Sequence, residues 1–267
     1  MPGVIFLIQG EKLVELREEP YDSEDLLQKL LADYPRILAG DQINSENPRR
    51  WLLIAREMGV PDAQNTSDRW SLDHLFIDQD GIPTLVEVKR STDTRIRREV
   101  VAQMLDYAAN GVEYWKVPEL KVKFEYSCQQ NGQNPAEVMQ QGLGPDVDYD
   151  RTWKTVEENF QNRKIRLLFV ADEIPKELKR IVEFLNEKMQ DVEVLAIEVR
   201  QFSGETLKTL VPRVIGQTSQ AVSLKTTSAI KWDETSFLEK IESDIGKQER
   251  STIEDILSWL KAEKIMI

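Results

Sequence analysis

The stretch 70–111, WSLDHLFIDQDGIPTLVEVKRSTDTRIRREVVAQMLDYAANG, decides the fold that the sequence predicts. Residues 70–77 and 83–89 are apolar runs rich in β-forming side chains, and Asp80-Gly81 between them is a strong turn signal. The remainder of the stretch has the pattern of a helix. We therefore expect a β-hairpin followed by a helix, and we expect the rest of the chain to support this unit.

Three charged side chains of the hairpin are expected to meet. Side chains alternate between the two faces of a strand, so Glu87 and Lys89 share one face with Leu85. If the turn centres near Asp80, Asp73 lies opposite Glu87 to within about one residue, which is cross-strand contact distance. Two carboxylates and a lysine then converge on one point of the sheet.

Such a group of side chains suits a hard divalent cation. Mg²⁺ prefers carboxylate and carbonyl oxygens and keeps several of its waters. A lysine beside the metal can orient a water or neutralise charge that develops on a phosphate. The alternative interpretation is an exposed hairpin with a solvated ion pair, which a single Glu-x-Lys pattern does not exclude.

The order of these residues resembles a known family signature. Asp73…Glu87-Val88-Lys89 resembles the D…(D/E)xK motif of the PD-(D/E)xK, or restriction-endonuclease-like, nuclease superfamily. The segment 103–107, QMLDY, resembles the QxxxY motif that RecB-type members carry on the helix after the lysine strand. The resemblance covers some forty residues and implies a nuclease that depends on Mg²⁺ or Mn²⁺.

The resemblance also implies roles for individual residues. Asp73 and Glu87 would hold the metal together with the Val88 carbonyl, and Lys89 would position the attacking water. On the following helix, Gln103 would steady the site or contact a phosphate, and Tyr107 would lie with it against the nucleic acid. Glu24, at the start of a helix over residues 24–34, is the matching position for a further metal ligand. A first-turn acid favoured by the helix dipole is an equally good account of Glu24.

Charge is distributed unevenly along the chain. The 267 residues carry a net charge of −12, which argues against nucleic-acid binding through overall charge. However, residues 89–98 hold five cations against Asp93 alone, namely Lys89, Arg90, Arg95, Arg97 and Arg98. Cations in a first helical turn oppose the helix dipole, so a phosphate backbone is a better reason for them than solvent. A solvated helix start is the alternative.

Several other chemistries lack the residues that they need. Cys128 is the sole cysteine, so the chain has no internal disulfide and no cysteine-rich metal site. His74 is the sole histidine, points away from Asp73 by strand alternation and is interpreted as structural, which leaves a zinc site without ligands. Phosphate-loop and dinucleotide-binding motifs are absent. No signal peptide or membrane span is recognisable, and we expect a cytoplasmic protein.

The whole chain is expected to form a mixed α/β fold. We predict an N-terminal β-hairpin at 1–18 and a restriction-endonuclease-like domain at 19–215, with a mixed central β-sheet flanked by helices. Residues 51–60, 120–126, 165–170, 192–202 and 206–214 are the further strands that we predict. Helices are predicted over 135–141, 152–160 and 175–189, and 112–151 as a whole is interpreted as an insertion. The hairpin covers a sheet edge or makes a homodimer contact, and the sequence does not decide between these.

The C-terminal part is expected to be separate. Residues 216–229 are rich in Ser, Thr and Gln and are predicted to be a linker. Residues 230–267 are predicted to form a small helical segment, with helices over 232–243 and from Ser251 to residue 261. Two helices rarely fold alone, so this segment docks on another surface or belongs to a longer domain.

The sequence therefore predicts a metal-dependent nuclease that hydrolyses phosphodiester bonds, with DNA as its partner. The alternative is a non-catalytic nucleic-acid-binding or assembly module on the same fold, which the acidic net charge favours slightly. An intact set of Asp73, Glu87 and Lys89 favours the enzyme, because a retired site has no physical reason to keep two mutually repelling carboxylates.

Overall fold

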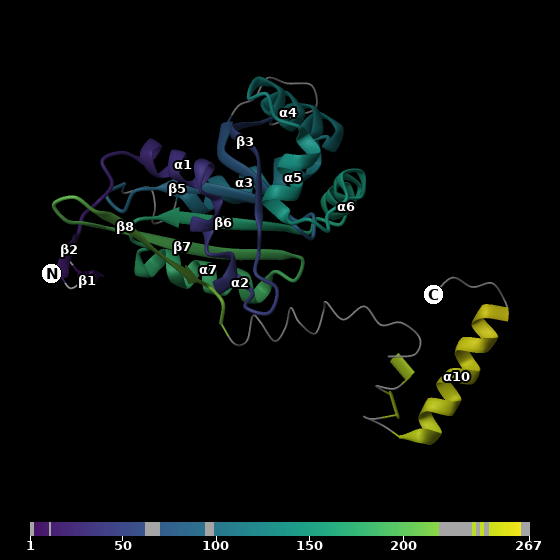
Figure 1. Ribbon diagram of the computed structural model, residues 1–267. Helices are drawn as coiled ribbons and strands as arrows, with labels where there is room; N and C mark the ends of the chain where they lie inside the picture. Colours follow the sequence, from purple (N-terminus) through teal and green to yellow (C-terminus); the bar gives the residue numbers. More distant parts are fainter. Residues whose placement is uncertain are drawn as a thin grey trace. The chain divides into compact units, whose positions relative to one another are not determined.

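A computed structural model describes residues 3–10, 12–61, 70–93, 99–218, 237–238, 241–242 and 246–262. The chain divides into two compact units, Met1–Val222 and Ser223–Ile267. The first unit contains the β-sheet (Figure 1). The described part of the second is dominated by one helix, α10 (Lys247–Ala262). No helix among the described residues is both long and apolar enough to cross a membrane.

The described residues of the first unit form an eight-stranded mixed sheet. Its order is β1-β2-β7-β6-β5-β4-β3, and β8 pairs with β7 off this path. Strands β5, β6 and β7 run parallel, and the other pairings are antiparallel. The strands are β1 (Val4–Gln9), β2 (Lys12–Glu18), β3 (Trp51–Val60), β4 (Trp70–Asp78), β5 (Pro83–Lys89), β6 (Ile165–Ala171), β7 (Val192–Ser203) and β8 (Lys208–Ile215).

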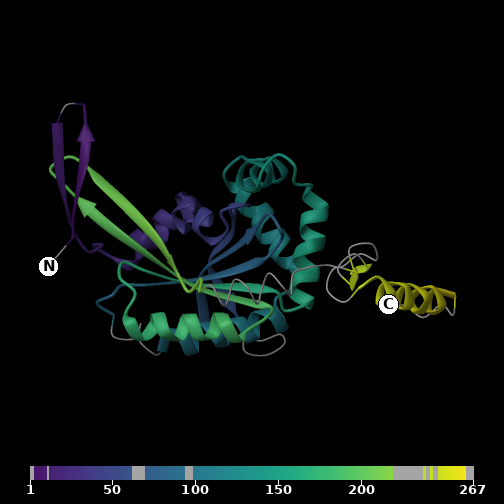
Figure 2. The same ribbon diagram turned by 90° about the horizontal axis from the view of Figure 1, so that it is seen from below.

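Helices cover both faces of the sheet (Figures 1 and 2). One face packs on α1 (Glu24–Asp33), the 3₁₀ turn η1 (Pro35–Leu38) and α2 (Gly40–Ile43). The other packs on α3 (Glu99–Tyr114), α6 (Tyr149–Gln161) and α7 (Lys176–Lys188). Every residue of β5 and β6 is buried, as expected for parallel strands with helices on both sides. The predicted class, a mixed sheet flanked by helices, is confirmed, and it is compatible with a restriction-endonuclease-like core.

Most of the predicted elements are present. The strand over 51–60 is confirmed as β3, and the hairpin of residues 70–89 is confirmed as β4 and β5. The helix after Pro175 is α7, and the predicted strands over 165–170, 192–202 and 206–214 are β6, β7 and β8. The helix predicted from Ser251 starts earlier, at Lys247. Of the predicted helix over 232–243 the structure describes only residues 237–238 and 241–242, which are helical, and most of the predicted linker lies outside the described residues.

The predicted strand over 120–126 is wrong. This segment belongs to α4 (Val117–Gln130), which is followed by α5 (Pro135–Leu143). The buried residues of α4 are Val117, Leu120, Phe124 and Cys128, and this spacing is that of one helical face. Both helices pack against β3, and the Trp115 indole donates to the Gly59 carbonyl at 2.8 Å. The insertion therefore covers the edge strand of the sheet.

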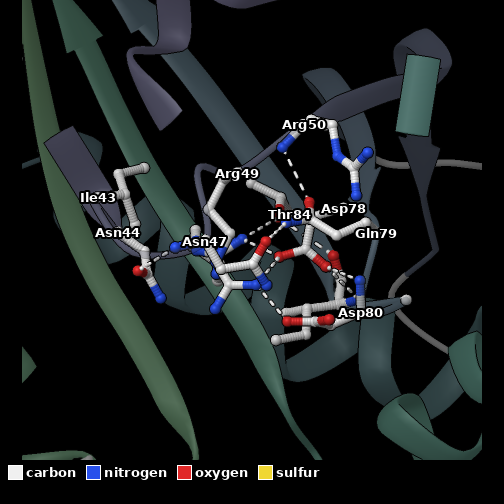
Figure 3. A network of polar contacts seen from close by, with 12 residues as sticks. Ile43, Asn44, Asn47, Arg49, Arg50, Asp78, Gln79, Asp80 and Thr84 are labelled. Carbon is white, nitrogen blue, oxygen red and sulfur yellow. Dashed lines mark hydrogen bonds and ion pairs between the residues drawn. The ribbon is translucent and has the colours of Figure 1, made fainter. Parts of the chain in front are cut away.

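The turn between β4 and β5 is held by a network of polar contacts (Figure 3). We call Asp78, Arg166 and Glu193, whose charges meet at this end of the hairpin, the paired end. Asp78 Oδ1 accepts from the backbone N–H groups of Asp80 and Ile82, each at 3.0 Å. Asp78 Oδ2 lies 2.9 Å from Nη1 of the fully buried Arg166. Arg166 Nε lies 2.5 Å from Glu193. Each buried charge at this end of the hairpin therefore has an opposite charge beside it.

The turn itself needs a glycine. Gly81 has a φ of 67°, in the left-handed region, and a Cβ there would lie 3.0 Å from the Thr155 side chain. Asn159 on α6 donates to the carbonyls of Asp80 and Gly81 at 3.0 and 2.8 Å. Helix α6 therefore holds the turn, which fixes the hairpin that carries the candidate site at its other end.

Candidate active site

Strand pairing brings Asp73 beside the end of β5. The register pairs His74 with Val86, so the next pair outward is Asp73 and Glu87. Asp73 Oδ2 accepts the Val88 backbone N–H at 2.7 Å. A side chain of β4 thus takes the bond that a strand neighbour would otherwise supply, and this locks the carboxylate against β5. We call Asp73, Glu87, Lys89 and Glu24 the acidic end of the hairpin.

Lys89 contacts two other members of the acidic end, Glu87 and Glu24. Its Nζ lies 2.8 Å from Glu87 Oε1, 2.9 Å from the Val88 carbonyl oxygen and 3.4 Å from Glu24 Oε1. The lysine is only 7% exposed. Burial lowers its pKa, but the adjacent Glu87 carboxylate and the other acids outweigh burial and leave the pKa raised. Lys89 is therefore an ammonium ion at neutral pH, held by acceptors on three sides.

Glu87, one of the two central carboxylates, has too few donors. Glu87 is 1% exposed, and its Oε2 is buried without a hydrogen-bond partner in the described part of the chain. Burial, followed by the charge of Asp73, raises the pKa of Glu87 to about 7. Burial also raises the pKa of Asp73 to about 6, although Lys89 and the Val88 N–H act in the opposite direction. One ammonium does not satisfy this pair, so the site has a deficit of positive charge.

The predicted helix pair Gln103 and Tyr107 lies beside the same cluster. Gln103 is half-buried on α3 and its amide donates to the Tyr107 hydroxyl. Burial raises the pKa of Tyr107, the Gln103 hydrogen bond acts in the opposite direction, and the charges of Glu87 and Asp73 raise it further. Tyr107 is 2% exposed, so the prediction that it contacts nucleic acid does not fit. A buried phenol instead holds the Gln103 amide in place.

The predicted cations have different positions. Arg90 is half-buried directly after β5, and its guanidinium donates to the Asp22 carbonyl at 3.3 Å, which links this strand end to the start of α1. Arg95, Arg97 and Arg98 lie outside the described residues. The phosphate-binding roles of all four arginines stay predictions.

His74 has a structural environment. It is fully buried, and Nε2 lies 2.8 Å from the Gln28 carbonyl oxygen on α1, on the side of the sheet away from Asp73. Burial lowers its pKa to about 4, so the imidazole is neutral at physiological pH. A neutral ring facing a helix carbonyl fits the structural interpretation made from the sequence.

Asp172 is a residue near the site that the sequence did not reveal. Its two carboxylate oxygens accept from the Ser91 backbone N–H at 2.6 Å and from the Ser91 hydroxyl at 3.0 Å. Asp172 directly follows β6, which runs parallel to β5 with Ala171 paired to Lys89. The available signal was its position after a buried strand, because carboxyl ends of parallel strands meet at one edge. Asp172 therefore holds the backbone at Ser91 in place, just after the end of β5.

The donor set of the acidic end fits the expected metal in its chemistry. Among the described residues, no three His, Cys, Asp or Glu side chains come close enough together to hold an ion. Glu24 contacts Lys89 and is not drawn into a three-acid group, so its role as a ligand stays a prediction. Two carboxylates and the Val88 carbonyl suit Mg²⁺ or Mn²⁺, which keep several waters, better than zinc. The unpartnered Glu87 Oε2 is an oxygen ready for a cation.

Comparisons with known proteins add little to this geometry. No family model matches the chain, and no curated protein matches it. A solved structure of an EndoMS–dsDNA2 complex resembles it with 15% sequence identity and a TM-score of 0.29 over 68% of this chain. The chain spans 61% of that solved chain. A likeness this distant leaves the function to be argued from the residues of the site.

Proposed function

We propose that the protein is a metal-dependent nuclease that hydrolyses phosphodiester bonds in DNA, in the cytoplasm. Mg²⁺ or Mn²⁺ would be held by Asp73, Glu87 and the Val88 carbonyl. The bound ion would polarise a phosphate oxygen and make a coordinated water more acidic. In the overall reaction the water oxygen joins phosphorus and one P–O ester bond breaks, which leaves a phosphate monoester and a free hydroxyl.

One observation carries this proposal: Lys89 Nζ sits where a cation is needed. It bridges Glu87 Oε1 and the Val88 carbonyl oxygen, two of the three expected metal ligands, at 2.8 and 2.9 Å. A solvated hairpin ion pair would be exposed, whereas Glu87 and Lys89 are 1% and 7% exposed. A site that keeps two carboxylates for one ammonium becomes neutral by taking up either a proton or a further cation.

The raised pKa of Lys89 defines its role. An ammonium ion cannot accept a proton, so Lys89 would act by orienting the attacking water and by stabilising negative charge on the phosphate. Gln103, fixed by Tyr107, would hold a second hydrogen-bonding group beside the reacting phosphate. Arg90, Arg95, Arg97 and Arg98 would contact the nucleic-acid backbone and position the substrate without reading its sequence.

The alternative is a nucleic-acid-binding or assembly module that performs no chemistry. The net charge of −12 favours this alternative. Asp73 and Glu87 disfavour it, because two neighbouring carboxylates with one ammonium between them lower the stability of the fold unless a cation binds. A cleavage assay separates these two functions.

The test is incubation of the full chain with labelled single- and double-stranded DNA and RNA, with Mg²⁺, Mn²⁺ or EDTA. We expect cleavage with metal and none with EDTA. Lys89→Ala should reduce cleavage by about a hundredfold or more, the usual loss for a charge-stabilising group. The matched control is Lys121→Ala, which removes another lysine–carboxylate pair, Lys121–Asp150 at 3.0 Å on the surface.

The control variant should cut at the parental rate. Equal rates for Lys89→Ala and the parent would show that the assigned mechanism is wrong. Binding without cleavage by the parent, for every substrate and metal, would favour the non-catalytic module.

A further inference from the structure

The N-terminal hairpin is attached to the sheet only at its base. Strands β1 and β2 pair along their whole length, from Val4–Arg17 to Gln9–Lys12. By contrast, β2 pairs with β7 only at Arg17–Ser203 and Glu18–Phe202. Most of the hairpin therefore projects beyond the sheet, which Figure 2 shows at the purple end of the chain. The projecting part has one face turned toward the body and one turned away.

The outward face is apolar. Strand register places Val4, Phe6, Ile8, Leu13, Glu15 and Arg17 on one face, which we call the hairpin face. Its four apolar side chains are 46%, 60%, 76% and 64% exposed. On the opposite face Leu16 is fully buried and packs near Gly204. Leu7 on that opposite face is 41% exposed, so most of the exposed apolar residues of the hairpin, four of five, lie on the hairpin face.

The size of this patch marks a contact surface. Phe184 is similarly exposed but lies singly on α7, as is common on protein surfaces, and Val122 has only Tyr126 beside it, one turn along α4. The four side chains of the hairpin face together expose roughly 400 Å² of apolar area, which is the size of functional patches on monomers. Two such faces in contact would bury roughly 800 Å² from these side chains alone, which is at the low end for specific interfaces.

The free edge of β1 leads to the same conclusion. Within the described residues β1 is the edge strand, and its sequence VIFLIQ contains no charge and no proline. Proteins that stay monomeric protect long edge strands with charges, prolines or covering elements. An uncharged edge next to an apolar face indicates a segment that is covered in the working protein.

The charge of the hairpin face identifies the partner. The face carries one acid and one base, Glu15 and Arg17, which lie 2.8 Å apart. It therefore has no net charge and offers nothing to a phosphate backbone or to an anionic lipid surface. In a chain of net charge −12, a neutral apolar face is a region where two copies can meet without repulsion.

We infer that the hairpin face binds the hairpin face of a second copy of this chain and forms a two-fold homodimer, with Phe6 near the axis. Phe6 lies between Val4 and Ile8 in the middle of the face, and a self-complementary contact places its centre on the symmetry axis. The inference rests on the hairpin alone and does not depend on the proposed nuclease activity.

The first test is the mass of the full chain in solution, measured by sedimentation equilibrium. The parent should be a dimer at micromolar concentration, and Phe6→Lys should weaken dimerisation about thirtyfold or more, as expected for a central interface residue. Phe184→Lys, which alters an equally exposed phenylalanine on α7, should leave the dimer unchanged. A monomeric parent, or a dimer that tolerates Phe6→Lys, would overturn the inference.

The second test is oxidative cross-linking, which reports on proximity and not on affinity. Phe6→Cys should form a disulfide-linked dimer, because a residue near a two-fold axis lies close to its own copy. Phe184→Cys should stay uncross-linked, and the native Cys128 is 4% exposed and does not interfere. Equal cross-linking of both variants would mean random collision and would count against the hairpin interface. Unchanged melting temperatures would show that both variants are folded.

Discussion

The two ends of the β4–β5 hairpin hold similar residues in opposite states. At the paired end, Arg166 lies between Asp78 and Glu193, and the Asp78 carboxylate also accepts two backbone N–H groups. At the acidic end, Asp73 and Glu87 share one ammonium, and Glu87 Oε2 has no partner in the described part of the chain. The same strands thus carry one site in which opposite charges are balanced and one site with too little positive charge. A buried charge stabilises the fold where its partners are complete and serves chemistry where they are not.

The largest effect should come from breaking the paired end. Arg166→Met removes the guanidinium that lies 2.9 Å from Asp78 and also contacts Glu193, and it should lower the free energy of unfolding by about 3–5 kcal/mol. The measurement is urea unfolding, with Arg180→Met on the exposed side of α7 as the control. The variant should keep its response to Mn²⁺, because the acidic end is untouched. A variant as stable as the parent would contradict the structural role of Arg166.

The acidic end should behave in the opposite way. Mn²⁺ at a hundredfold excess over its Kd should stabilise the parent by about 2.7 kcal/mol, which shifts melting by several degrees. Asp73→Asn removes a repelling charge, and its amide oxygen can still accept the Val88 N–H. The metal-free variant should therefore melt no lower than the parent, yet lose the Mn²⁺ shift. If millimolar Mn²⁺ does not change the melting temperature of the parent, the proposed metal site is wrong.

The pH should also distinguish the two ends, because the raised pKa values of Asp73 and Glu87 belong to the acidic end. Burial raises the pKa of Asp73 to about 6 and that of Glu87 to about 7, so the folded state binds more protons than the unfolded chain from about pH 4 to 7. Stability of the metal-free protein should therefore fall as pH rises through this range. Denaturant unfolding between pH 5 and 8 measures this.

Two additions to that experiment identify the groups responsible. The double variant Asp73→Asn, Glu87→Gln should flatten the slope of stability against pH. Saturating Mn²⁺ should reverse its direction, since metal binding requires the deprotonated carboxylates. A slope that survives in the double variant would assign the effect to other groups.

The smallest effect concerns the arginines that follow the acidic end. Replacing Arg95, Arg97 and Arg98 with Ala should weaken nucleic-acid binding about equally for all sequences. It should also flatten the salt dependence by up to about 0.9 log unit for each phosphate that an arginine no longer neutralises. Arg180→Ala is the matched control, since this arginine lies on α7. An unchanged salt slope would return the three arginines to the interpretation of a solvated helix start.

The two ends also differ in how far the sequence predicts them. Asp73, Glu87 and Lys89 were recognisable because a hairpin has a fixed period and a turn of known length, so local rules place these residues side by side. The paired end was not predicted, because Arg166 reaches Asp78 across 88 positions of sequence, and only the crossover to β6 brings them together. The segment 120–126 was misassigned because apolar and charged residues alternate strictly in LKVKFEY, which is the period of a strand. The helix buries only Leu120 and Phe124 of these residues and exposes Val122 and Tyr126.

The arrangement of helices α4 and α5 on β3 has a consequence for assembly. These helices cover one edge strand of the sheet, while the other edge strand, β1, is bare within the described residues. A particle with two bare edges can add copies at both and grow into a fibre. With β3 covered, strands cannot be added at both edges, and the hairpin-face dimer closes at two copies without pairing either edge. Deleting α4 and α5 would bare the second edge and would permit open growth by strand addition at both.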